Sequence, residues 1–581
     1  MIDFQWLIGG EAGNGIMTTG AMMSKIFTRL GLSVFDYTEY PSLIRGGHNA
    51  YYVRASDVEI FSQKKPVEIL VALNRETIDL HKHELSENAC VIYDPTIVKI
   101  TYGEFPPHIK LFSVPLLEIT RKEKASRFMM NTVALGASLA LIYDDYSVIK
   151  ELLEETFGKK GEEVIQENVN LSQNGYNFVK EHFYHKCPIV IRKKMQENLL
   201  IGGLEAVSLG AIKAGLKFAA IYPMTPTSGI IPELAKHALD YNIIIKEPED
   251  EISGINMAIG AGFAGVRSMV ATSGGGFSLM VEGVGLSAQT ETPVVIIMGM
   301  RPGPATGMPT WTSQGDLRFM LHAAQDEFPR VVLAPGDHQE AVYLTMKAFN
   351  LAEKYQLPVI VLVDKYLMEG HATVEISNFK SQISNFQIER GKFVSDEDLE
   401  NETDYKRYLL TDDGISPRSI PGQKGGIALS GSDEHDQRGL YNEEIENRIE
   451  MMNKRFKKLD VMLEDLDPPQ FFGWKDADVT ILSWGSNKLP IFEAMKWLKK
   501  DGISVNYLHV THMYPFPADE IKAVIGHAKH TLVIEGNKTG QFEGIIREYT
   551  GLSAHNHLRK YDGRPFYPEE ITEYVKSLIV K

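Results

Sequence analysis

Short apolar runs recur along the chain and alternate with segments in which apolar residues have helical spacing. In the first third, apolar runs lie at residues 4–8, 69–73 and 91–93, and residues 16–30 have the pattern of a helix. A glycine turn joins the first run to this helix. Strands that alternate with helices are typical of α/β folds. We therefore predict an α/β domain over residues 1–190.

The same rhythm restarts at about residue 199 and continues over a longer stretch. Helical segments separate nearly all of its apolar runs, which favours a doubly wound parallel sheet. We predict this second domain over residues 195–380, with strands at residues 218–222, 243–245, 268–271, 294–298, 331–333 and 359–363.

Residues 381–470 break the alternation, because they are charged and rich in glycine and lack short apolar runs. Within them, residues 443–466 have the charge pattern of a helix that packs across a domain or a partner. The sequence thus predicts a charged linker with a helical segment, followed by a smaller α/β domain over residues 471–581. The strands of that last domain are expected at residues 479–484, 505–510 and 531–534.

Size and apolar content indicate a multidomain protein outside the membrane. A chain of 581 residues with 44% apolar content is expected to divide into about three or four domains. The apolar runs are far shorter than a membrane span, and Asp3 interrupts any signal sequence at the N-terminus. We therefore expect a cytoplasmic protein.

Charge and cysteine content narrow the range of partners. A formal net charge of −16 argues against nucleic acid and anionic membranes, because both require a cationic surface. The two cysteines, Cys90 and Cys187, cannot supply the four thiolates of a usual iron-sulfur cluster. Any such cluster must therefore lie on another chain.

Two prolines flank a threonine directly after the strand expected at residues 218–222. Pro223 and Pro226 restrict the backbone here, so the Thr225 hydroxyl is presented rigidly. Open parallel sheets bind ligands beyond the carboxyl ends of their strands. Thr225 is therefore a candidate ligand contact, although a plain proline-stiffened turn fits the same residues equally well.

An acidic run ends at Glu251, at the start of a helix expected over residues 252–264. Glycine and alanine are frequent in this helix, which permits close packing of its backbone. A glutamate in a first helical turn is often only a favourable partner of the helix dipole. Glu251 by itself therefore does not identify a site.

Two further strands end in residues that suit anions. The strand at residues 268–271 runs into Ser273 and a glycine loop that begins at Gly274, whose amides suit an anion or a planar cofactor. Arg301 follows the strand at residues 294–298, where a guanidinium group can bind a carboxylate through two parallel hydrogen bonds. Taken alone, Arg301 is equally consistent with a surface loop.

A functional interpretation of these features is favoured because they follow consecutive strands of one predicted sheet. Thr225, Glu251, the glycine loop at Gly274 and Arg301 are each expected near the end of a different strand. Because the carboxyl ends of parallel strands meet at one edge, we predict that the four features converge there.

The first strand ends in a glycine-rich loop at residues 9–15 that is similar to a dinucleotide-binding loop. Asp36 follows at about the right distance for a ribose contact. Thr18 stands where the third glycine of that pattern is required, so nicotinamide binding is not favoured. The segment at residues 45–49, which includes Arg45, fits either a phosphate contact or a simple turn.

Seven motifs in a fixed order carry a resemblance to a known family. They are Gly10-Glu11-Ala12-Gly13-Asn14-Gly15, Arg45-Gly46-Gly47-His48, Asn131-Thr132-Val133-Ala134-Leu135-Gly136, Tyr222-Pro223-Met224-Thr225-Pro226-Thr227-Ser228, Glu249-Asp250-Glu251, Arg301-Pro302-Gly303-Pro304-Ala305-Thr306-Gly307 and Glu535-Gly536-Asn537-Lys538-Thr539-Gly540-Gln541. The chain resembles the 2-oxoacid:ferredoxin oxidoreductases in which a gamma domain is fused ahead of the alpha domains. The resemblance implies a Rossmann-like gamma domain, a thiamine-diphosphate-type sheet domain that binds the pyrimidine, and a C-terminal domain like that of transketolases.

The same resemblance implies a role for each candidate residue. Thr225 contacts the substrate, Glu251 meets the pyrimidine ring of thiamine diphosphate, and Arg301 holds the carboxylate of the oxoacid. Ser273 and Gly274 are also expected to bind the cofactor, on the strength of the glycine-loop pattern. No metal ligand is expected on this chain.

Partners and further cofactors also follow from the resemblance. Thiamine enzymes commonly hold Mg²⁺ and the diphosphate through a Gly-Asp-Gly loop, which this sequence does not contain. The cofactor is therefore expected to be shared with a beta subunit that carries Mg²⁺ and a [4Fe-4S] cluster, in a heterodimer or a dimer of heterodimers. Coenzyme A is implied as a substrate and ferredoxin as the electron acceptor.

The fused architecture favours 2-oxoglutarate as the oxoacid, with oxidation to an acyl-CoA and CO₂ or the reverse carboxylation. Trp311 stands where some members of the family have basic residues, which leaves pyruvate, branched-chain or aryl oxoacids open. Two other functions also stay open. They are a self-sufficient thiamine enzyme of the transketolase type and a noncatalytic α/β assembly subunit.

Overall fold

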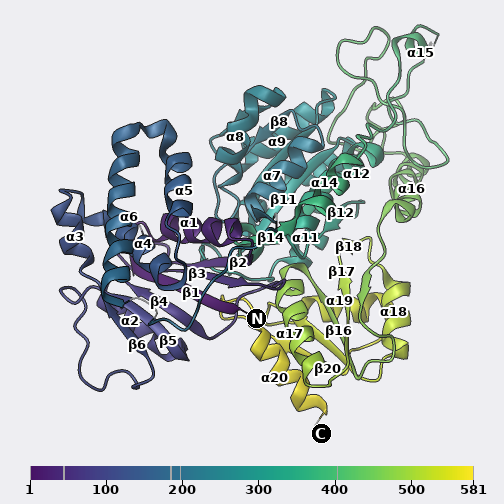
Figure 1. The fold of residues 1–581 in the computed structure, drawn as a ribbon. Coiled ribbons are helices and arrows are strands. Elements are labelled where there is room, and N and C mark those ends of the chain that lie inside the picture. The colour runs from purple at the N-terminus through teal and green to yellow at the C-terminus, as the bar shows by residue number, and fades with distance from the viewer. Residues whose placement is uncertain (1, 44–45, 184–185, 197, 402–403, 580–581) are drawn as a thin grey trace.

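The computed structural model describes residues 2–43, 46–183, 186–196, 198–401 and 404–579. The described strands form three sheets of eight, seven and five strands, with helices packed against them (Figure 1). The α/β class predicted from the sequence is confirmed. Within these residues, no helix combines the length and the apolar character that crossing a membrane requires.

The first sheet takes most of its strands from the first third of the chain. The strands β1, β4, β5 and β6 run parallel, β3 pairs antiparallel with β1, and β2 pairs antiparallel with β3. The apolar residues of α1, α4, α5 and α6 pack on one face of this sheet. Its elements are β1 (Asp3–Glu11), α1 (Ile16–Arg29), β2 (Ser33–Glu39), β3 (His48–Ser56), β4 (Val67–Ala72), α2 (Arg75–His81), β5 (Leu85–Tyr93), β6 (Lys110–Ser113), α3 (Leu116–Lys122), α4 (Met130–Ile142), α5 (Ser147–Phe157) and α6 (Glu162–Phe183).

Two more strands of this sheet come from later in the chain. β14 (His371–Glu375) pairs antiparallel with β2, and β7 (Asn198–Gly202) pairs antiparallel with β14. The full order is therefore β6-β5-β4-β1-β3-β2-β14-β7. The first sheet therefore includes strands from beyond residue 190, where the sequence places the end of the first domain. The domain boundaries remain predictions.

The second sheet has the order β18-β12-β13-β11-β10-β8-β9. All neighbours run parallel except β18 (His512–Tyr514), which is antiparallel to β12. Residues of α7 and α12 pack on one face and residues of α9 and α10 on the other, so the predicted doubly wound arrangement is confirmed. The elements are α7 (Gly203–Lys213), β8 (Phe218–Ala220), α8 (Ile230–Tyr241), β9 (Ile244–Lys246), α9 (Glu251–Phe263), β10 (Ser268–Ser273), α10 (Gly274–Gln289), β11 (Val294–Met300), α11 (Leu317–His322), β12 (Val331–Leu333), α12 (His338–Tyr355), β13 (Pro358–Asp364), α13 (Lys365–Glu369) and α14 (Ile376–Ser384).

The third sheet has the order β15-β17-β16-β19-β20 and shares a core with the second. Apolar residues of α18 and α19 pack in the same cluster as those of α9 and α10. The C-terminal domain is therefore fixed against the second sheet, as Figure 1 shows at the lower right. The remaining elements are α15 (Asp396–Asn401), α16 (Ile445–Met462), β15 (Gln470–Phe472), β16 (Val479–Trp484), α17 (Lys488–Lys500), β17 (Val505–Val510), α18 (Ala518–His527), β19 (Thr531–Glu535), α19 (Gln541–Thr550), β20 (Asn556–Arg559) and α20 (Pro568–Ile579).

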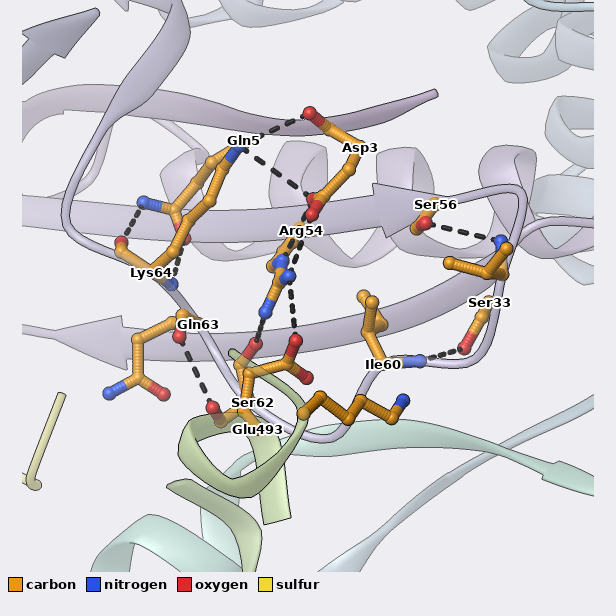
Figure 2. A network of polar contacts seen from close by, with 12 residues as sticks. Asp3, Gln5, Ser33, Arg54, Ser56, Ile60, Ser62, Gln63, Lys64 and Glu493 are labelled. Carbon is orange, nitrogen blue, oxygen red and sulfur yellow. Dashed lines mark hydrogen bonds and ion pairs between the residues drawn. The ribbon is translucent and has the colours of Figure 1, made fainter. Parts of the chain in front are cut away.

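A buried arginine joins the first sheet to the C-terminal domain (Figure 2). Arg54 on β3 donates from Nε and Nη2 to the two carboxylate oxygens of Asp3 at 2.9 and 2.8 Å, and from Nη1 to the Ser62 carbonyl at 2.7 Å. Its Nη2 also donates to Glu493 Oε1 on α17 at 3.1 Å. The second oxygen of Glu493 accepts the Phe61 N–H at 3.1 Å. The side chains of Arg54 and Glu493 are 1% and 4% exposed, so this link excludes solvent.

We predict that Arg54→Met destabilises the chain by about 3–5 kcal/mol, because the Glu493 carboxylate is left buried without its cation. Thermal unfolding followed by circular dichroism measures the change. Arg75→Met is the matched control, since the Arg75 side chain is 39% exposed and its ion pairs are worth at most about 1 kcal/mol. Equal losses in the two variants would contradict the role of Arg54.

Candidate active site

Four neighbouring strands bring the predicted site residues to one edge of the second sheet. β9, β8, β10 and β11 lie next to one another and run parallel, so their carboxyl ends meet. Thr225 lies in the loop after β8, Glu251 follows β9, Ser273 ends β10 and Arg301 directly follows β11. This edge is where open parallel sheets bind ligands.

A direct hydrogen bond joins two of the predicted residues. Arg301 Nη1 donates to the backbone carbonyl of Thr225 at 2.9 Å. The Thr225 loop is itself held by the N–H groups of Thr227 and Ser228, which donate to the Met224 carbonyl at 2.8 and 2.9 Å. Burial lowers the pKa of Arg301, and the nearby carboxylate of Asp316 opposes that shift. The guanidinium is therefore oriented by the loop that presents the threonine.

Glu251 is the first residue of α9, and its side chain is buried against α10. The preceding Asp250 caps α9 by accepting the Ser253 N–H at 2.8 Å, and Glu251 is 5% exposed. A Cβ atom placed on Gly276 would lie 2.5 Å from Glu251 Oε1 and 2.1 Å from Thr272 Oγ1. Glycine at position 276 therefore makes the room in which the Glu251 carboxyl sits.

The predicted glycine loop is a helical turn. Residues 274–276 form the first turn of α10, and Ser273 stands at its N-cap with extended backbone. The Ser273 hydroxyl does not cap the helix and faces Met224 Sδ at 3.8 Å. The amides of a helical first turn lack partners within the helix and carry its positive dipole end. This turn beside Glu251 fits a cofactor that presents hydrogen-bond acceptors, as thiamine diphosphate does.

The structure adds Asp316, which is not among the residues selected from sequence. A Cβ atom placed on Gly274 would lie 2.9 Å from Asp316 Oδ2, so this carboxyl faces the first turn of α10. Burial raises the pKa of Asp316 to about 6, although the positive charge of Arg301 lowers it. A carboxyl group with a raised pKa thus lies at the same sheet edge as Arg301, as is common at functional sites.

The C-terminal motif at residues 535–541 holds the segment that carries Asp316. The N–H of Gln314 donates to the Gly536 carbonyl at 2.8 Å, and the Gly536 N–H donates to Gln314 Oε1 at 2.8 Å. Gln541 Nε2 donates to the Gly315 carbonyl at 2.6 Å. The motif therefore positions the site from another domain and does not itself supply a side chain to Arg301 or Glu251.

Trp311 lies beside a cation from the C-terminal domain. The guanidinium carbon of Arg564 is 3.3 Å from the centre of the Trp311 ring. Trp311 also lines a small cavity whose wall includes Tyr37 of the first sheet and Lys365. Positive charge is therefore supplied next to position 311 by other parts of the chain.

The motifs of the first domain contact one another. A Cβ atom on Gly15 would lie 2.2 Å from Asn131 Nδ2, which donates to Thr19 Oγ1 at 2.9 Å. The Asp36 carboxylate, in contrast, accepts hydrogen bonds from Ser24, Tyr51 and His371 at 2.6, 2.9 and 2.9 Å. Because Asp36 is buried in these contacts, the structure gives no support to a ribose contact. Arg45 lies outside the described residues.

The two cysteines of the chain lie side by side in the first domain. Cys90 and Cys187 are buried free thiols whose sulfur atoms lie 3.0 Å apart. The described residues contain no group of three or more His, Cys, Asp or Glu side chains arranged to hold a metal ion.

Three family models match successive parts of the chain. "Pyruvate ferredoxin/flavodoxin oxidoreductase" matches residues 5–178, and "Pyruvate flavodoxin/ferredoxin oxidoreductase, thiamine diP-bdg" matches residues 209–454. "Pyruvate:ferredoxin oxidoreductase core domain II" matches residues 477–571. The thiamine-diphosphate-binding match spans the sheet edge that holds Thr225, Glu251 and Arg301.

Known relatives match over the whole length. The 2-oxoacid:ferredoxin oxidoreductase subunit alpha of Saccharolobus solfataricus is 32% identical, over 99% of this chain and 98% of the relative. The 2-oxoglutarate synthase subunit KorA of Methanothermobacter thermautotrophicus is 33% identical, over 66% of this chain and all of the relative. A solved 2-oxoglutarate:ferredoxin oxidoreductase from Magnetococcus marinus superposes with a TM-score of 0.91 and 31% identity, over 100% of both chains.

Identity above 30% over the full length and the cofactor-binding match at the described edge lead to one conclusion. The chain belongs to the thiamine-diphosphate-dependent 2-oxoacid:ferredoxin oxidoreductases, in which it is the fused gamma-alpha subunit of a multisubunit enzyme.

Proposed function

We propose that this chain, assembled with a beta subunit, catalyses the coenzyme A-dependent oxidation of 2-oxoglutarate to succinyl-CoA and CO₂, or the reverse carboxylation, with ferredoxin as the electron carrier. The observation that carries the proposal is Arg301, which is hydrogen bonded to the Thr225 loop at the edge that also holds Glu251. The choice of oxoacid is supported by the Methanothermobacter relative and by the Magnetococcus structure, which has 2-oxoglutarate, coenzyme A and succinyl-CoA bound.

Glu251, Ser273 and Gly274 are the residues that would hold thiamine diphosphate on this chain. When bound, the cofactor supplies the carbon nucleophile for the 2-oxo group and the electron sink for decarboxylation. The Glu251 carboxyl holds a proton at the pyrimidine ring nitrogen, which is the general acid-base role that a buried carboxyl group at this edge can fill. The amides of the first turn of α10 would donate hydrogen bonds to acceptor atoms of the bound cofactor.

Arg301 binds the substrate carboxylate and Thr225 orients the substrate beside it. The hydrogen bond from Nη1 to the Thr225 carbonyl fixes the plane of the guanidinium, so its remaining N–H groups have a defined direction. Asp316 weakens binding of the substrate carboxylate. With a pKa raised to about 6 by burial, it is mostly ionised at pH 7.5 and then opposes a second negative charge near Arg301.

The beta subunit supplies what this chain does not provide. The sequence contains no Gly-Asp-Gly loop and two cysteines, which supports placement of Mg²⁺ and a [4Fe-4S] cluster on the partner. We propose a heterodimer or a dimer of heterodimers that shares one thiamine diphosphate between the alpha and beta chains.

The oxoacid is tested with the purified two-subunit complex. We expect 2-oxoglutarate to give the highest kcat/KM among 2-oxoglutarate, pyruvate, branched-chain and aryl oxoacids, with reduction of a redox dye as the readout. A higher kcat/KM for pyruvate or for an apolar oxoacid would reject 2-oxoglutarate as the substrate and leave the family assignment intact.

We predict that Glu251→Gln lowers the rate of proton exchange at the thiazolium carbon of bound thiamine diphosphate by at least about 100-fold, because general acid-base groups contribute roughly 10²–10⁴. Nuclear magnetic resonance of the assembled complex in deuterated buffer measures this rate. The control is Glu249→Gln, which neutralises an exposed acid two residues earlier. Exchange at the wild-type rate in Glu251→Gln would remove Glu251 from the mechanism.

We predict that removal of the two charges near the substrate changes its KM in opposite directions. Arg301→Ala loses a charged hydrogen-bond pair worth about 1.5–3 kcal/mol, so the KM for the oxoacid rises roughly 10- to 150-fold. Asp316→Asn removes an opposing charge worth about 1 kcal/mol in water-like surroundings, so the KM at pH 7.5 falls roughly fivefold.

The pH dependence of the KM distinguishes the loss of the Asp316 charge from a structural effect of Asp316→Asn. Below pH 5 the wild-type Asp316 is mostly protonated, so the variant and the wild type should have the same KM there. Asp326→Asn, at an exposed position ten residues later, is the control. The same KM ratio at both pH values, or an unchanged KM in Arg301→Ala, would count against the charge roles.

A further inference from the structure

A second cavity lies far from the active-site edge, in the glycine-rich part of the segment at residues 381–470. Its volume is about 200 Å³, smaller than the pockets of about 300–1,000 Å³ that hold drug-sized ligands. None of its lining residues is acidic. They include Thr292, Arg407, Arg418 and Ala428. Pro421, Gly422 and Ile427 are exposed, so the cavity opens to solvent.

The two arginines of this cavity are almost completely buried, at 3% exposed for Arg407 and 2% for Arg418. Arg407 Nη2 donates to the Glu291 carbonyl at 2.8 Å, and Arg418 Nη1 donates to the Gly262 carbonyl at 2.9 Å. Within the described chain, Arg407 Nη1 and Arg418 Nε are buried without a hydrogen-bond acceptor. A buried donor without an acceptor costs about 1–3 kcal/mol, and more when it is charged.

Positive charge exceeds negative charge among the buried groups around the cavity. Glu353 accepts from Arg267 at 2.8 Å and from Arg418 at 3.1 Å. Glu291 pairs with Lys454 at 2.6 Å and with Lys458 at 2.5 Å. Two carboxylates, Glu291 and Glu353, thus serve five cations that are each at most 3% exposed, which are Arg267, Arg407, Arg418, Lys454 and Lys458.

The lowered pKa values of two of these cations agree with an excess of buried positive charge. Burial lowers the pKa of Lys454 to about 7, against the attraction of Glu291. Burial also lowers the pKa of Arg418 to about 10, against the attraction of Glu353. The internal carboxylates therefore do not fully offset the cost of burying these positive charges.

This cavity is separate from the active site. Thr292 precedes β11 and lines the cavity, whereas Arg301 follows β11 at the opposite end of the strand. At about 3.3 Å per residue, the nine steps between these residues span roughly 30 Å. An anion in the cavity is therefore not the substrate carboxylate that Arg301 would bind.

We propose that the cavity binds a small oxyanion, a carboxylate or a phosphate group, between Arg407 and Arg418. The oxygens of both anions accept charge-assisted hydrogen bonds from guanidinium N–H groups, and each of the two arginines has a buried N–H group without an acceptor among the described residues. The anion takes the free N–H groups of the two arginines and offsets the excess of buried cations. The proposal does not rest on the identity of the oxoacid or of the partner subunit.

Isothermal titration of inorganic phosphate and of acetate into the purified full chain, at constant ionic strength, tests the proposal. We expect saturable binding of at least one anion. Binding of phosphate alone identifies a phosphate group as the ligand, and binding of acetate alone identifies a carboxylate. Arg407→Gln and Ala428→Phe should each weaken binding at least tenfold, since one removes a donor and the other fills the cavity. Ala428→Phe changes no charge, so it keeps the test valid if Arg407→Gln does not fold.

Lys424→Gln is the matched control, because Lys424 is exposed in the same loop and does not line the cavity. It removes one positive charge and should leave binding within about twofold of the wild type. The proposal is overturned if neither anion binds saturably, or if Arg407→Gln and Ala428→Phe, confirmed as folded by circular dichroism, bind as the wild type does.

Discussion

The parallel pairing of β8, β10 and β11 is the constraint on which the rest of the site depends. Residues 218–219 pair with residues 268–269, and residues 269–273 pair with residues 295–299, so the three strands point their carboxyl ends to the same edge. The loops that follow must then share one edge. Arg301 reaches the Thr225 carbonyl across 76 residues of sequence only because this register brings their loops together.

Other domains complete the edge by hydrogen bonds and not by catalytic side chains. The third sheet shares an apolar core with the second, and its motif at residues 535–541 pairs with Gln314 and Gly315 next to Asp316. The first sheet is tied to α17 through Arg54 and Glu493 (Figure 2). The chain is thus a single framework in which the position of Asp316 depends on contacts more than 200 residues away.

Strong apolar runs made much of the fold predictable. The strands at residues 331–333, 479–484 and 505–510 have the predicted bounds, because each is a continuous buried run. β2 and β3 were not predicted, since the buried charges Asp36 and Arg54 interrupt their apolar pattern. Besides nearby partners, these charges are bonded to His371 and Glu493, which are more than 300 residues away. Local sequence carries no sign of such partners.

At the site too, features that follow local sequence were predictable and features that depend on distant contacts were not. Thr225, Glu251, Ser273, Gly274 and Arg301 stand out because each follows a predicted strand, and parallel pairing then brings them together. The glycine run was expected as a loop and is helical, since glycine leaves the backbone free to do either. Asp316 was missed because only the approach of Gly274 and Arg301 makes its carboxyl unusual.

The central claim is that this edge is half of a cofactor site which a second polypeptide completes. Titration of thiamine diphosphate with Mg²⁺ into the isolated chain and into the assembled complex tests it most directly. The account predicts saturable binding by the complex and binding at least 100-fold weaker by the isolated chain. Equal affinity of the two, with turnover by the isolated chain alone, would contradict it.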